Sequence, residues 1–539
     1  MKKWRILTNN SPETIEEVID TITKNRNSSD FTKDLDLLSI TAEKAGIDKK
    51  EVKKATKRIE NAIQNNEQII VFGDYDADGI CASTILWETL YSKSKKAMPY
   101  LPDRKNEGYG LSISAIDNIL QKYPDTKLII TVDNGILSHD AVIYAQEKKI
   151  DIIITDHHTK GEIYPDALSV IYTTKLCGAG VAWMLAKELE DNKDKIISKL
   201  DLVAIAAIAD LVPLTDINRA LVKKGLERLN ATQRLGLKEL IAEARIQNRK
   251  IGVYDIGYII APRLNAAGRV GHAIESLRLL CTNSHDNARI FAGKLSAQNR
   301  KRQMITENLT QHAKAGMKKV ATSSKILIAH HKSYDEGIIG LIASKLVEEY
   351  YLPSIAISVG DEISKGSARS ISGVNIIEFI NKAEKYLERA GGHPMAAGFT
   401  IKTKKIEEFK KKLEEEAQRI VTDDLLIKEL RIDTKLQFSL IEEALHHAIQ
   451  ELYPFGIGNP EPTFVTQKVK VSKFDFVGKD ASHLRLYLEQ EGKIIEGIGF
   501  GLAPVFKSKI GDKIDVAYTI DINEWKGRRK MNLKIKDFK

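Results

Sequence analysis

Cysteine is scarce in this chain of 539 residues, and long apolar runs are missing. The three cysteines, Cys81, Cys177 and Cys281, are far apart and form no CxxC pair, so the sequence predicts neither a disulfide framework nor a zinc site made from them. No apolar run approaches the roughly 18–20 residues of a membrane span, and the N-terminus lacks the apolar core of a signal peptide. These absences favour a reducing, cytoplasmic location and a protein without a membrane partner.

The charge balance is mildly basic. Lysine and arginine number 82 against 73 aspartates and glutamates, a net charge of +9. This excess favours a polyanionic partner such as nucleic acid, although it is modest for the length. The content of 43% hydrophobic and 29% charged residues is that of an ordinary globular protein, with enough chain for three or four domains.

Three short apolar runs carry the main positional signal. They cover residues 69–72, 128–132 and 152–155, are rich in β-branched residues, and end in polar residues or glycine, which is typical of buried parallel strands. Helical periodicity separates them, so the sequence predicts an α/β domain with a mostly parallel sheet. Ligands of such sheets bind beyond the carboxyl ends of the strands. All three runs end there in acids or histidines.

The rest of the chain is organised differently. A polar stretch over 286–319 predicts a long exposed helix, and apolar runs at 325–329 and 354–357 predict strands of a second α/β unit. After about residue 430, short alternating runs separated by glycine and Asn-Pro turns predict a small β-barrel. The expected segments are an N-terminal helical extension (1–45), a catalytic α/β domain (46–285), a connecting helix (286–320), a second α/β domain (321–425) and the barrel (426–539).

The first cluster of candidate ligands is Asp74-Tyr75-Asp76-Ala77-Asp78-Gly79. Alternate carboxylates this close repel one another unless a cation neutralises them, and Mg²⁺ and Mn²⁺ prefer oxygen ligands. A calcium loop of the EF-hand type also starts D-x-D-x-D-G, but its twelfth position requires a glutamate and here holds Ile85. For this cluster taken alone, a solvated acidic turn remains the other interpretation.

Three further elements complete the candidate site. Asp156-His157-His158 ends the third strand, whereas the pairs His330-His331 and His446-His447 are interpreted as structural or surface histidines. Asp133 ends the second strand and, before Asn-Gly, could equally be a turn former. Asp210 follows an almost wholly apolar run, where a carboxylate is costly unless it is paired or metal-bound, or faces solvent at a helix end.

In this order, the motifs resemble the DHH phosphoesterase superfamily, and within it bacterial single-strand-specific exonucleases. The resemblance begins near residue 45 and runs to the C-terminus. The motifs that carry it lie at 73–79, at 101–104 with 107–110, at 156–158, at 263–269, at 391–394 and at 454–462.

The resemblance implies a fold and a metal centre. The fold class is α/β: a parallel-sheet DHH domain and a second α/β DHHA1 domain joined by a long helix, with a C-terminal OB-like barrel. Two divalent ions, Mn²⁺ or Mg²⁺, are implied. Asp76 would hold one and Asp78 the other, Asp133 would bridge both, and His157 and Asp210 would complete the second site. His158 would contact the scissile phosphate.

One departure from the superfamily concerns the first ion. Related phosphatases place a histidine where this chain has Phe72, which leaves that ion one ligand short. We hypothesise that Asp74 or water fills the gap.

The resemblance also implies substrate contacts. Arg104, Ser367 and Arg369 would form a pocket for a 5′ phosphate, and His393, presented by paired glycines, would donate to a phosphate. Arg263, Asn265 and Arg269 would face the cleft. For the linker residues Asn299, Arg302 and Gln303 a solvated helix face is the alternative, and for the barrel aromatics Phe474, Phe476, Tyr487 and Trp525, beside the basic run 528–530, core packing is the alternative.

The expected function is therefore a 5′ to 3′ exonuclease that acts on single-stranded DNA, releases nucleoside 5′-monophosphates and serves DNA repair and recombination. A single-strand-binding protein and a recombination helicase are the expected protein partners. The rivals are a DHH phosphodiesterase of short oligonucleotides or cyclic dinucleotides, whose members usually lack the OB region, and a catalytically inactive DNA-binding scaffold, whose members lose metal ligands.

Overall fold

The computed structural model describes residues 2–26, 35–103, 107–108, 110–525 and 528–539. The chain divides into two compact units, and each is described by itself. The large unit comprises Ile6–Ser296 and Arg431–Lys539, and the small unit comprises Met1–Arg5 and Ala297–Leu430.

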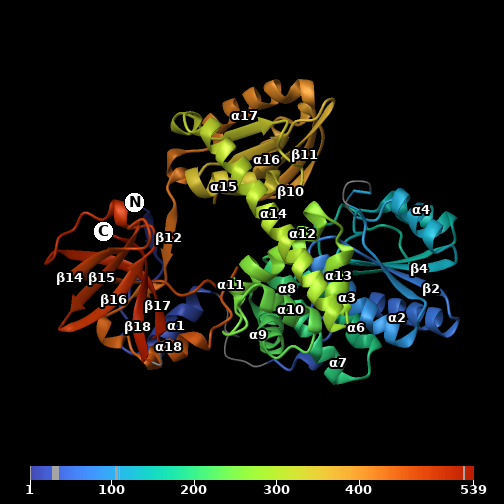
Figure 1. Cartoon of the computed structure of the whole chain (residues 1–539), viewed down its shortest axis with the longest axis horizontal. Coiled ribbons are helices and arrows are strands. Elements are labelled where there is room, and N and C mark those ends of the chain that lie inside the picture. The colour runs from blue at the N-terminus through green and yellow to red at the C-terminus, as the bar shows by residue number, and fades with distance from the viewer. Residues whose placement is uncertain (1, 27–34, 104–106, 109, 526–527) are drawn as a thin grey trace. The chain divides into compact units, whose positions relative to one another are not determined.

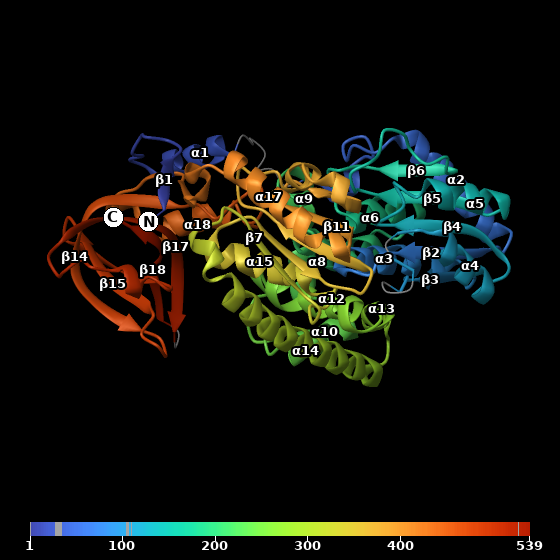
Figure 2. The ribbon, with the colours of Figure 1, turned by 90° about the horizontal axis from the view of Figure 1, so that it is seen from above.

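A five-stranded parallel sheet forms the centre of the N-terminal part of the large unit. Its order is β3-β2-β4-β5-β6, with every neighbouring pair parallel, as Figure 2 shows. The strands are β2 (Gln68–Gly73), β3 (Ala97–Tyr100), β4 (Thr126–Val132), β5 (Asp151–Asp156) and β6 (Ser169–Tyr172). The three strands predicted from the apolar runs are thus the adjacent strands β2, β4 and β5, and their carboxyl ends meet at one edge.

Helices cover both faces of this sheet because its strands are apolar on both sides. Ile70, Ile129 and Ile152 pack against α4 (Ile113–Lys122) and α5 (His139–Glu147). Ile69, Ile130 and the other alternating residues pack on the opposite face against α2 (Lys49–Gln64), α3 (Ala77–Lys93) and α6 (Gly178–Leu189). In Figure 1, α4 and α2 lie on opposite sides of the sheet.

A helical layer continues the large unit beyond the sheet. Its centre is α8 (Leu200–Ala209), an almost wholly apolar helix that packs on α3 and is buried through most of its length. The other members are α7 (Lys193–Ser198), α9 (Asp216–Asn230), α10 (Leu235–Glu243), α11 (Val253–Asp255), the π-helical turn η2 (Ile256–Ile260), α12 (Ala261–Val270) and α13 (Ile274–Cys281).

The C-terminal part of the large unit is a closed barrel, as predicted. Pairing of β14 with both β15 and β17 closes the sheet. Its strands are β14 (Phe464–Val477), β15 (His483–Gln490), β16 (Lys493–Gly499), β17 (Lys513–Trp525) and β18 (Arg528–Phe538), with the short β13 (Thr434–Lys435) added to β14 and α18 (Glu443–Gln450) before it.

The N-terminal segment, predicted as a helical extension, contains a strand as well as a helix. β1 (Lys3–Ile6) is a strand that pairs with β12 (Glu429–Ile432). The amphipathic helix α1 (Ile15–Asn25) follows, and its buried Val18 and Ile22 pack with Leu445 and Ile449 of α18 in the core of the barrel region. Residues from opposite ends of the chain therefore share one hydrophobic core.

The small unit contains the second α/β fold. Its sheet has the order β10-β11-β9-β8-β7, in which only β7 and β8 are parallel. The strands are β7 (Leu327–His331), β8 (Ser354–Ser358), β9 (Ile363–Arg369), β10 (Leu387–His393) and β11 (Ala396–Lys402). β7 lies two residues later than predicted. α15 (Ile339–Tyr350) covers one face, and α16 (Ile376–Asn381) and α17 (Ile406–Ile420) cover the other.

The predicted long helix is present as α14 (His285–Met317), which spans 33 residues. The boundary between the two units falls within it. Among the described residues, none of the helices is both long enough and apolar enough to span a membrane.

Candidate metal centre

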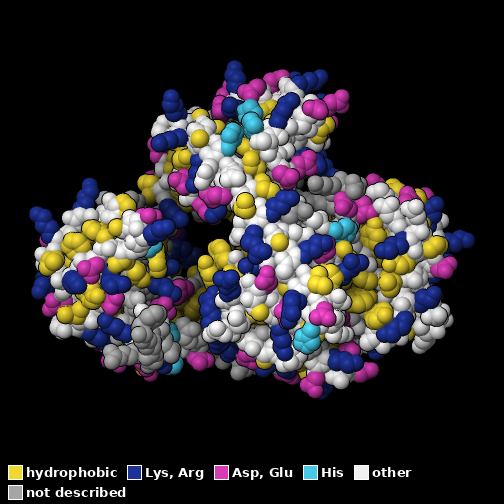
Figure 3. Space-filling model, viewed as in Figure 1, with side chains coloured by type: hydrophobic (Ala, Val, Ile, Leu, Met, Phe, Trp, Pro, Cys, Tyr) yellow, Lys and Arg dark blue, Asp and Glu magenta, His cyan; other side chains and the backbone are white. Residues whose placement is uncertain are grey.

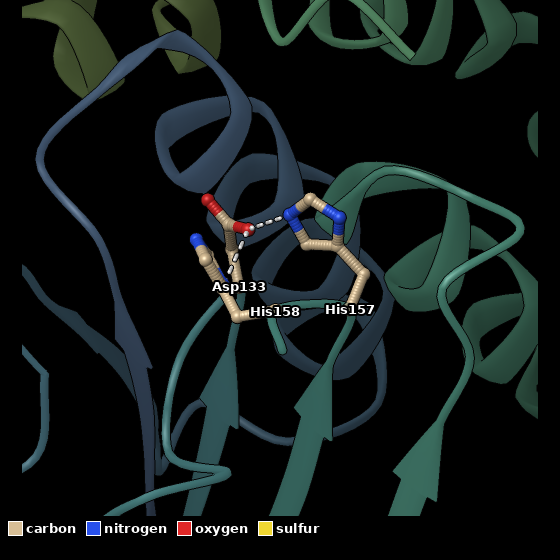
Figure 4. A group of neighbouring side chains, drawn as sticks. All are labelled: Asp133, His157 and His158. Atoms are coloured by element: carbon tan, nitrogen blue, oxygen red, sulfur yellow. Dashed lines mark ion pairs between the residues drawn. The ribbon is translucent and has the colours of Figure 1, made fainter. Parts of the chain in front are cut away.

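The centre of the candidate site is formed by Asp133, at the end of β4, and His157 and His158, directly after β5 (Figure 4). His157 Nε2 lies 3.0 Å from Asp133 Oδ1, and His158 Nδ1 lies 4.0 Å from the same oxygen. Asp133 is 2% exposed and has a φ of 64°, in the left-handed region that aspartate tolerates better than most residues. The strained backbone turns its carboxylate towards the two histidines.

The loop between β2 and α3 brings Asp74, Asp76 and Asp78 to the same edge. Asp76 is the N-cap of α3, and its Oδ1 accepts hydrogen bonds from the N–H groups of Asp78 and Gly79 at 2.9 and 3.1 Å. The loop packs closely on the helix, since a β-carbon at Gly79 would lie 2.6 Å from Asp74 Cβ. A glycine is therefore required at the end of the D-x-D-x-D-G motif.

Asp78 is held by a helix that the sequence reasoning missed. Its two carboxylate oxygens accept hydrogen bonds from the backbone N–H groups of Gly178 and Ala179, each at 2.7 Å. These groups belong to the first turn of α6, where unpaired N–H groups and the helix dipole favour an anion. The glycine-rich start of α6, Gly178-Ala179-Gly180, was the available signal.

Asp210 joins the site from the far end of the apolar helix α8. It is the C-cap of that helix, its side chain is 31% exposed, and its Oδ2 lies 3.7 Å from His157 Nε2. It is thus a helix-end acid, and its carboxylate is turned to the other acids of the site.

The side chains form three overlapping groups whose ligand atoms lie within 4.8 Å of one another. The groups are Asp74 with Asp76 and Asp133; Asp78 with His157 and Asp210; and Asp133 with His157 and His158. Asp133 belongs to two of the groups, as expected of a bridging ligand. Its Oδ1 atom is buried and accepts no hydrogen bond from the described residues. This set of oxygen and imidazole donors suits Mn²⁺ or Mg²⁺.

The electrostatics of the three acids favour a bound cation. Burial and the charge of Asp76 raise the pKa of Asp78 to about 7, against the opposing N–H groups of α6. Burial and the charges of Asp78 and Asp76 raise the pKa of Asp210 to about 8. The pKa of Asp133 rises well above its ordinary value for the same two reasons. A cation among these carboxylates would offset both the cost of burying them and their mutual repulsion.

Asp156 supports the histidines from behind. Its Oδ1 accepts hydrogen bonds from the N–H groups of His157 and His158 and lies 2.8 Å from His158 Nδ1, while its Oδ2 accepts from Ile136 N–H. Burial alone would lower the pKa of His158, but the Asp156 carboxylate and the charges of Asp74 and Asp210 raise it to about 9. A proton on Nδ1 directed at Asp156 leaves Nε2 for a substrate.

Phe72, where related phosphatases have a histidine, takes no part in the site. Its ring is fully buried and stacks on Tyr100 at 5.7 Å between centroids. Asp74 instead lies beside Asp76 and Asp133, which supports the hypothesis that it supplies the missing ligand.

The helix α12 lies directly behind the loop of acids. Asn265 Oδ1 accepts a hydrogen bond from Ala77 N–H at 2.6 Å, and a β-carbon at Gly268 would lie 2.5 Å from Tyr75 O. The Asn265 side chain therefore supports the acidic loop. Arg263 Nη1 donates to Ile259 O, and Arg269 is half-buried on the same helix.

The predicted phosphate-binding residues of the small unit share one face of its sheet. Arg369 on β9 is opposite Ala396 on β11, which is opposite His393 on β10, and residues in register point to the same face. Arg369 and His393 are therefore two strands apart, roughly 10 Å, with a small alanine between them.

Arg369 has the environment of an anion-binding residue. It donates to Ser367 Oγ at 3.1 Å and to Ala368 O at 2.9 Å, and burial lowers its pKa. Within the described part of the chain, no acidic side chain lies at ion-pair distance from it. A β-carbon at Gly340, in the first turn of α15, would lie 3.0 Å from Arg369 Nη2 and 3.2 Å from Ser367 Oγ. The N-terminus of α15 thus adds its own preference for an anion.

The remaining residues named in the sequence analysis lie outside the metal centre or outside the described residues. Arg104 lies outside the described residues, as does the side chain of Trp525. His330 lies 3.4 Å from Glu407, His331 contacts Ser333, and His446 and His447 lie on α18, away from the acids of the candidate centre. On α14, Asn299 is buried, Arg302 is half-buried and Gln303 is exposed. Phe474 packs with Phe506 at the barrel core, whereas Phe476 is exposed.

Three domain families match the chain in the order in which the structure places the folds. They are the DHH family N-terminal domain over residues 68–208, the DHHA1 domain over 323–419 and the RecJ OB domain over 432–537. The fold and the site are therefore those of a DHH-family protein.

Comparison with whole proteins narrows this class. The single-stranded-DNA-specific exonuclease RecJ of Salmonella typhimurium is 31% identical over 513 residues, which cover 88% of each chain. The RecJ of Bacillus subtilis is 34% identical over 505 residues, 90% of this chain and 63% of that relative. Crystal structures of Thermus thermophilus RecJ with Mn²⁺ and with Mg²⁺ match at TM-scores of 0.84 and 0.77 and 26% identity, covering all of this chain and 79% and 78% of those chains. The chain belongs to the RecJ family.

Proposed function

We infer that this chain is a metal-dependent exonuclease that degrades single-stranded DNA from the 5′ end and releases nucleoside 5′-monophosphates. The observation that carries this proposal is the convergence of Asp78, Asp133, His157 and Asp210, from two strand ends and two helix ends, on one buried point. The relatives are named as single-stranded-DNA-specific exonucleases, which supports the substrate.

The ligand groups support a division between two divalent ions. Asp74 and Asp76 would hold one ion, Asp78, His157 and Asp210 the other, and Asp133 both. Crystal structures of Thermus thermophilus RecJ in complex with Mn²⁺ and in complex with Mg²⁺ support either ion for this chain. The raised pKa values of Asp78 and Asp210 support a cation between them because its charge would offset the burial and the carboxylate repulsion that cause both shifts.

Divalent ions bound there would supply a hydroxide at neutral pH and neutralise the charge that develops at phosphorus. The chain's own residues would donate a hydrogen bond to the phosphate and hold the metal ligands in position. His158, kept protonated by Asp156, would donate from Nε2 to a non-bridging oxygen of the scissile phosphate. The N–H groups of α6 would keep Asp78 in place, and Asn265 would keep the acidic loop from opening.

The polarity of the reaction rests on the small unit. We propose that Ser367, Arg369 and the first turn of α15 bind the 5′ phosphate, with Arg104 and His393 as further donors. The half-buried guanidinium of Arg369, which has no acidic partner among the described residues, supports this role because a bound anion would stabilise such a cation.

The setting in the cell is part of the same proposal. Membership of the RecJ family supports a role in DNA repair and recombination, a cytoplasmic location, and a single-strand-binding protein and a recombination helicase as partners. Lysine and arginine side chains are spread over the visible face of the molecule rather than confined to one part of it (Figure 3), which suits a polyanionic partner contacted at many points.

The test is degradation of long single strands labelled at the 5′ or the 3′ end, with Mn²⁺, Mg²⁺ or chelator. We expect metal-dependent release of a labelled mononucleotide at once from the 5′-labelled strand and progressive shortening of the 3′-labelled strand. Asp133→Ala should abolish turnover and leave DNA binding measurable. Faster turnover of a dinucleotide than of a long strand would favour the small-substrate phosphodiesterase instead, against which the closed barrel argues.

A further inference from the structure

Two tyrosines form an exposed aromatic pair at the junction of α11 and η2. Tyr254 is 65% exposed and Tyr258 is 71% exposed. Their rings stack on each other, with centroids 4.7 Å apart and an angle of 23° between the planes. Large aromatic side chains this exposed gain little from burial, so the pair is available to a ligand.

The backbone that presents the pair is firmly held. Val253 N–H donates to the Tyr453 hydroxyl at 3.2 Å, and Asp255 accepts from Gly252 N–H and from Arg249. The π-helical turn η2 then packs on α8, the helix that ends at Asp210. π-helical turns are rare and often occur at functional sites. The tyrosines are therefore displayed on a well-supported segment that packs on the helix leading to Asp210.

The pair lies on a stripe that leads to the acidic loop. Tyr254, Tyr258 and Pro262 follow one another at intervals of four residues, and Asn265 and Arg269 follow at three and four. Asn265 and Arg269, four residues apart on α12, share one face of that helix, and the π-helical turn η2 that carries Tyr258 runs directly into α12. All five residues are exposed or half-buried. Asn265 touches the loop of metal-binding acids through Ala77 N–H. A continuous helical segment therefore connects the aromatic pair to the loop of metal-binding acids.

The chemistry of the segment suits a nucleobase on a charged backbone. Residues 249–270 contain four basic side chains, Arg249, Lys250, Arg263 and Arg269, and one acid, Asp255, which Arg249 neutralises. Single strands are bound without sequence preference by aromatic rings that stack bases beside cations that follow the phosphates.

We propose that Tyr254 and Tyr258 form a stacking platform for a base of the single strand downstream of the scissile phosphate. This proposal rests on the proposed function and adds a subsite to it. Seven residues separate Tyr258 from Asn265, which at about 1.5 Å per residue is roughly 10 Å, the span of about three stacked nucleotides. A dinucleotide would be too short to reach the platform, whereas strands of about four nucleotides or more would reach it.

The experiment compares the double variant Tyr254→Ala/Tyr258→Ala with Tyr254→Phe/Tyr258→Phe and the unaltered chain. The probes are 5′-phosphorylated oligothymidylates of 2 to 24 nucleotides. Binding is measured on the Asp133→Ala background and kcat/KM on the active chain. The alanine pair should weaken binding of long strands by roughly 5- to 100-fold, as expected for the loss of stacking on one base. The phenylalanine pair should bind like the unaltered chain because it keeps both rings.

The length series separates stacking from damage to the fold. We expect the alanine pair to lose affinity only for strands long enough to reach the tyrosines. An abasic position about three nucleotides from the 5′ end should weaken binding to the unaltered chain but not binding to the alanine pair. Unchanged binding of long strands by the alanine pair would overturn the proposal, as would an equal loss on the dinucleotide or an equal loss in the phenylalanine pair. An unaltered chain that degrades no single strand would instead overturn the proposed function.

Discussion

The α-carbon of Gly178 faces the carboxylate of Asp133, so closely that a β-carbon at Gly178 would lie 2.4 Å from Asp133 Oδ1. The N–H of the same glycine donates to Asp78 at 2.7 Å. One residue at the start of α6 thus positions two of the proposed metal ligands, one by a hydrogen bond and the other by leaving room for it.

Gly178→Ala should therefore displace Asp133 or tilt the start of α6. Because a misplacement of about 1 Å in a catalytic group costs on the order of 10²-fold in rate, we expect a loss of that size in kcat on single-stranded DNA and a higher Mn²⁺ concentration for half-maximal rate. Gly293→Ala on α14 is the matched control, since nothing lies within 4 Å of a β-carbon there. A Gly178→Ala protein with unchanged rate and metal dependence would contradict the close approach.

Metal binding should stabilise the protein more at high pH than at low pH. The raised pKa values of Asp78, about 7, and Asp210, about 8, mean that the metal-free native state binds more protons than the unfolded chain between about pH 4 and pH 8. Stability of the metal-free protein therefore falls as pH rises through this window.

Mn²⁺ replaces these protons, so its stabilising effect should grow over the same range. We expect a larger rise of Tm on adding Mn²⁺ at about pH 8.5 than at about pH 6, measured against chelator at each pH. In Asp133→Asn the rise should be much smaller. A rise that is independent of pH would show that the carboxylates are already ionised without metal.

A buried ion-pair network joins the far ends of α3 and α8, whose other ends carry Asp78 and Asp210. Glu88 pairs with Arg234 through both oxygens, at 2.6 and 2.9 Å, and with Lys199 at 3.0 Å. Burial would raise the pKa of Glu88, but Arg234 and Lys199 lower it to about 2. The stability that Glu88 contributes is thus present above about pH 4.5 and is lost as pH falls through about 2.

Glu88→Gln should destabilise the protein at neutral pH by about 3 kcal/mol, because it leaves the largely buried guanidinium of Arg234 with only Asp201, at 3.4 Å, as a carboxylate partner. The difference from the unaltered chain should shrink between about pH 4.5 and pH 2, as followed by denaturant unfolding. Glu227→Gln, which breaks an exposed pair with Lys224, is the control and should cost about 0.5 kcal/mol. An equal loss of unfolding free energy in the two variants would show that the Glu88 pair contributes no more than an exposed ion pair.

The sequence was sufficient to predict the part of the site that lies at strand ends. Apolar runs that end in acids identify β2, β4 and β5, and adjacent parallel strands bring their carboxyl ends together, so Asp76, Asp133 and His157 had to meet if the strands were neighbours. Asp210 has no such rule behind it. It comes from the end of a helix: its apolar flank indicated a paired or metal-bound carboxylate, and the resemblance to a known family connected it with the ions held at the strand ends.

Backbone groups and long-range packing were beyond the reach of the sequence. The N–H groups of Gly178 and Ala179 that hold Asp78 leave no mark in side-chain chemistry, because every residue but proline carries one. The helix α1 is amphipathic by its spacing, but nothing local in the sequence indicates that Val18 and Ile22 find their partners in α18, more than 400 residues later.

Arg369 provides a test of the proposed polarity that does not depend on the metal centre. Its guanidinium is half-buried beside Ser367 and the first turn of α15, and no carboxylate of the described residues lies at ion-pair distance from it. A 5′ phosphate would balance the charge of the guanidinium. The charge-assisted hydrogen bonds between them are worth about 1.5–3 kcal/mol, or roughly 10- to 100-fold in binding. Arg369→Gln should therefore reduce the ratio of kcat/KM on 5′-phosphorylated strands to that on 5′-hydroxyl strands by this factor.

The control for this prediction is Arg389→Gln, which removes an exposed arginine from β10 of the same sheet and should leave the ratio unchanged. The ratio separates phosphate recognition from general damage, since loss of folding or of metal would lower both rates together. If Arg369→Gln lowers the rate equally on the two kinds of 5′ end, the guanidinium contacts another part of the strand, and the 5′ to 3′ polarity needs a different origin.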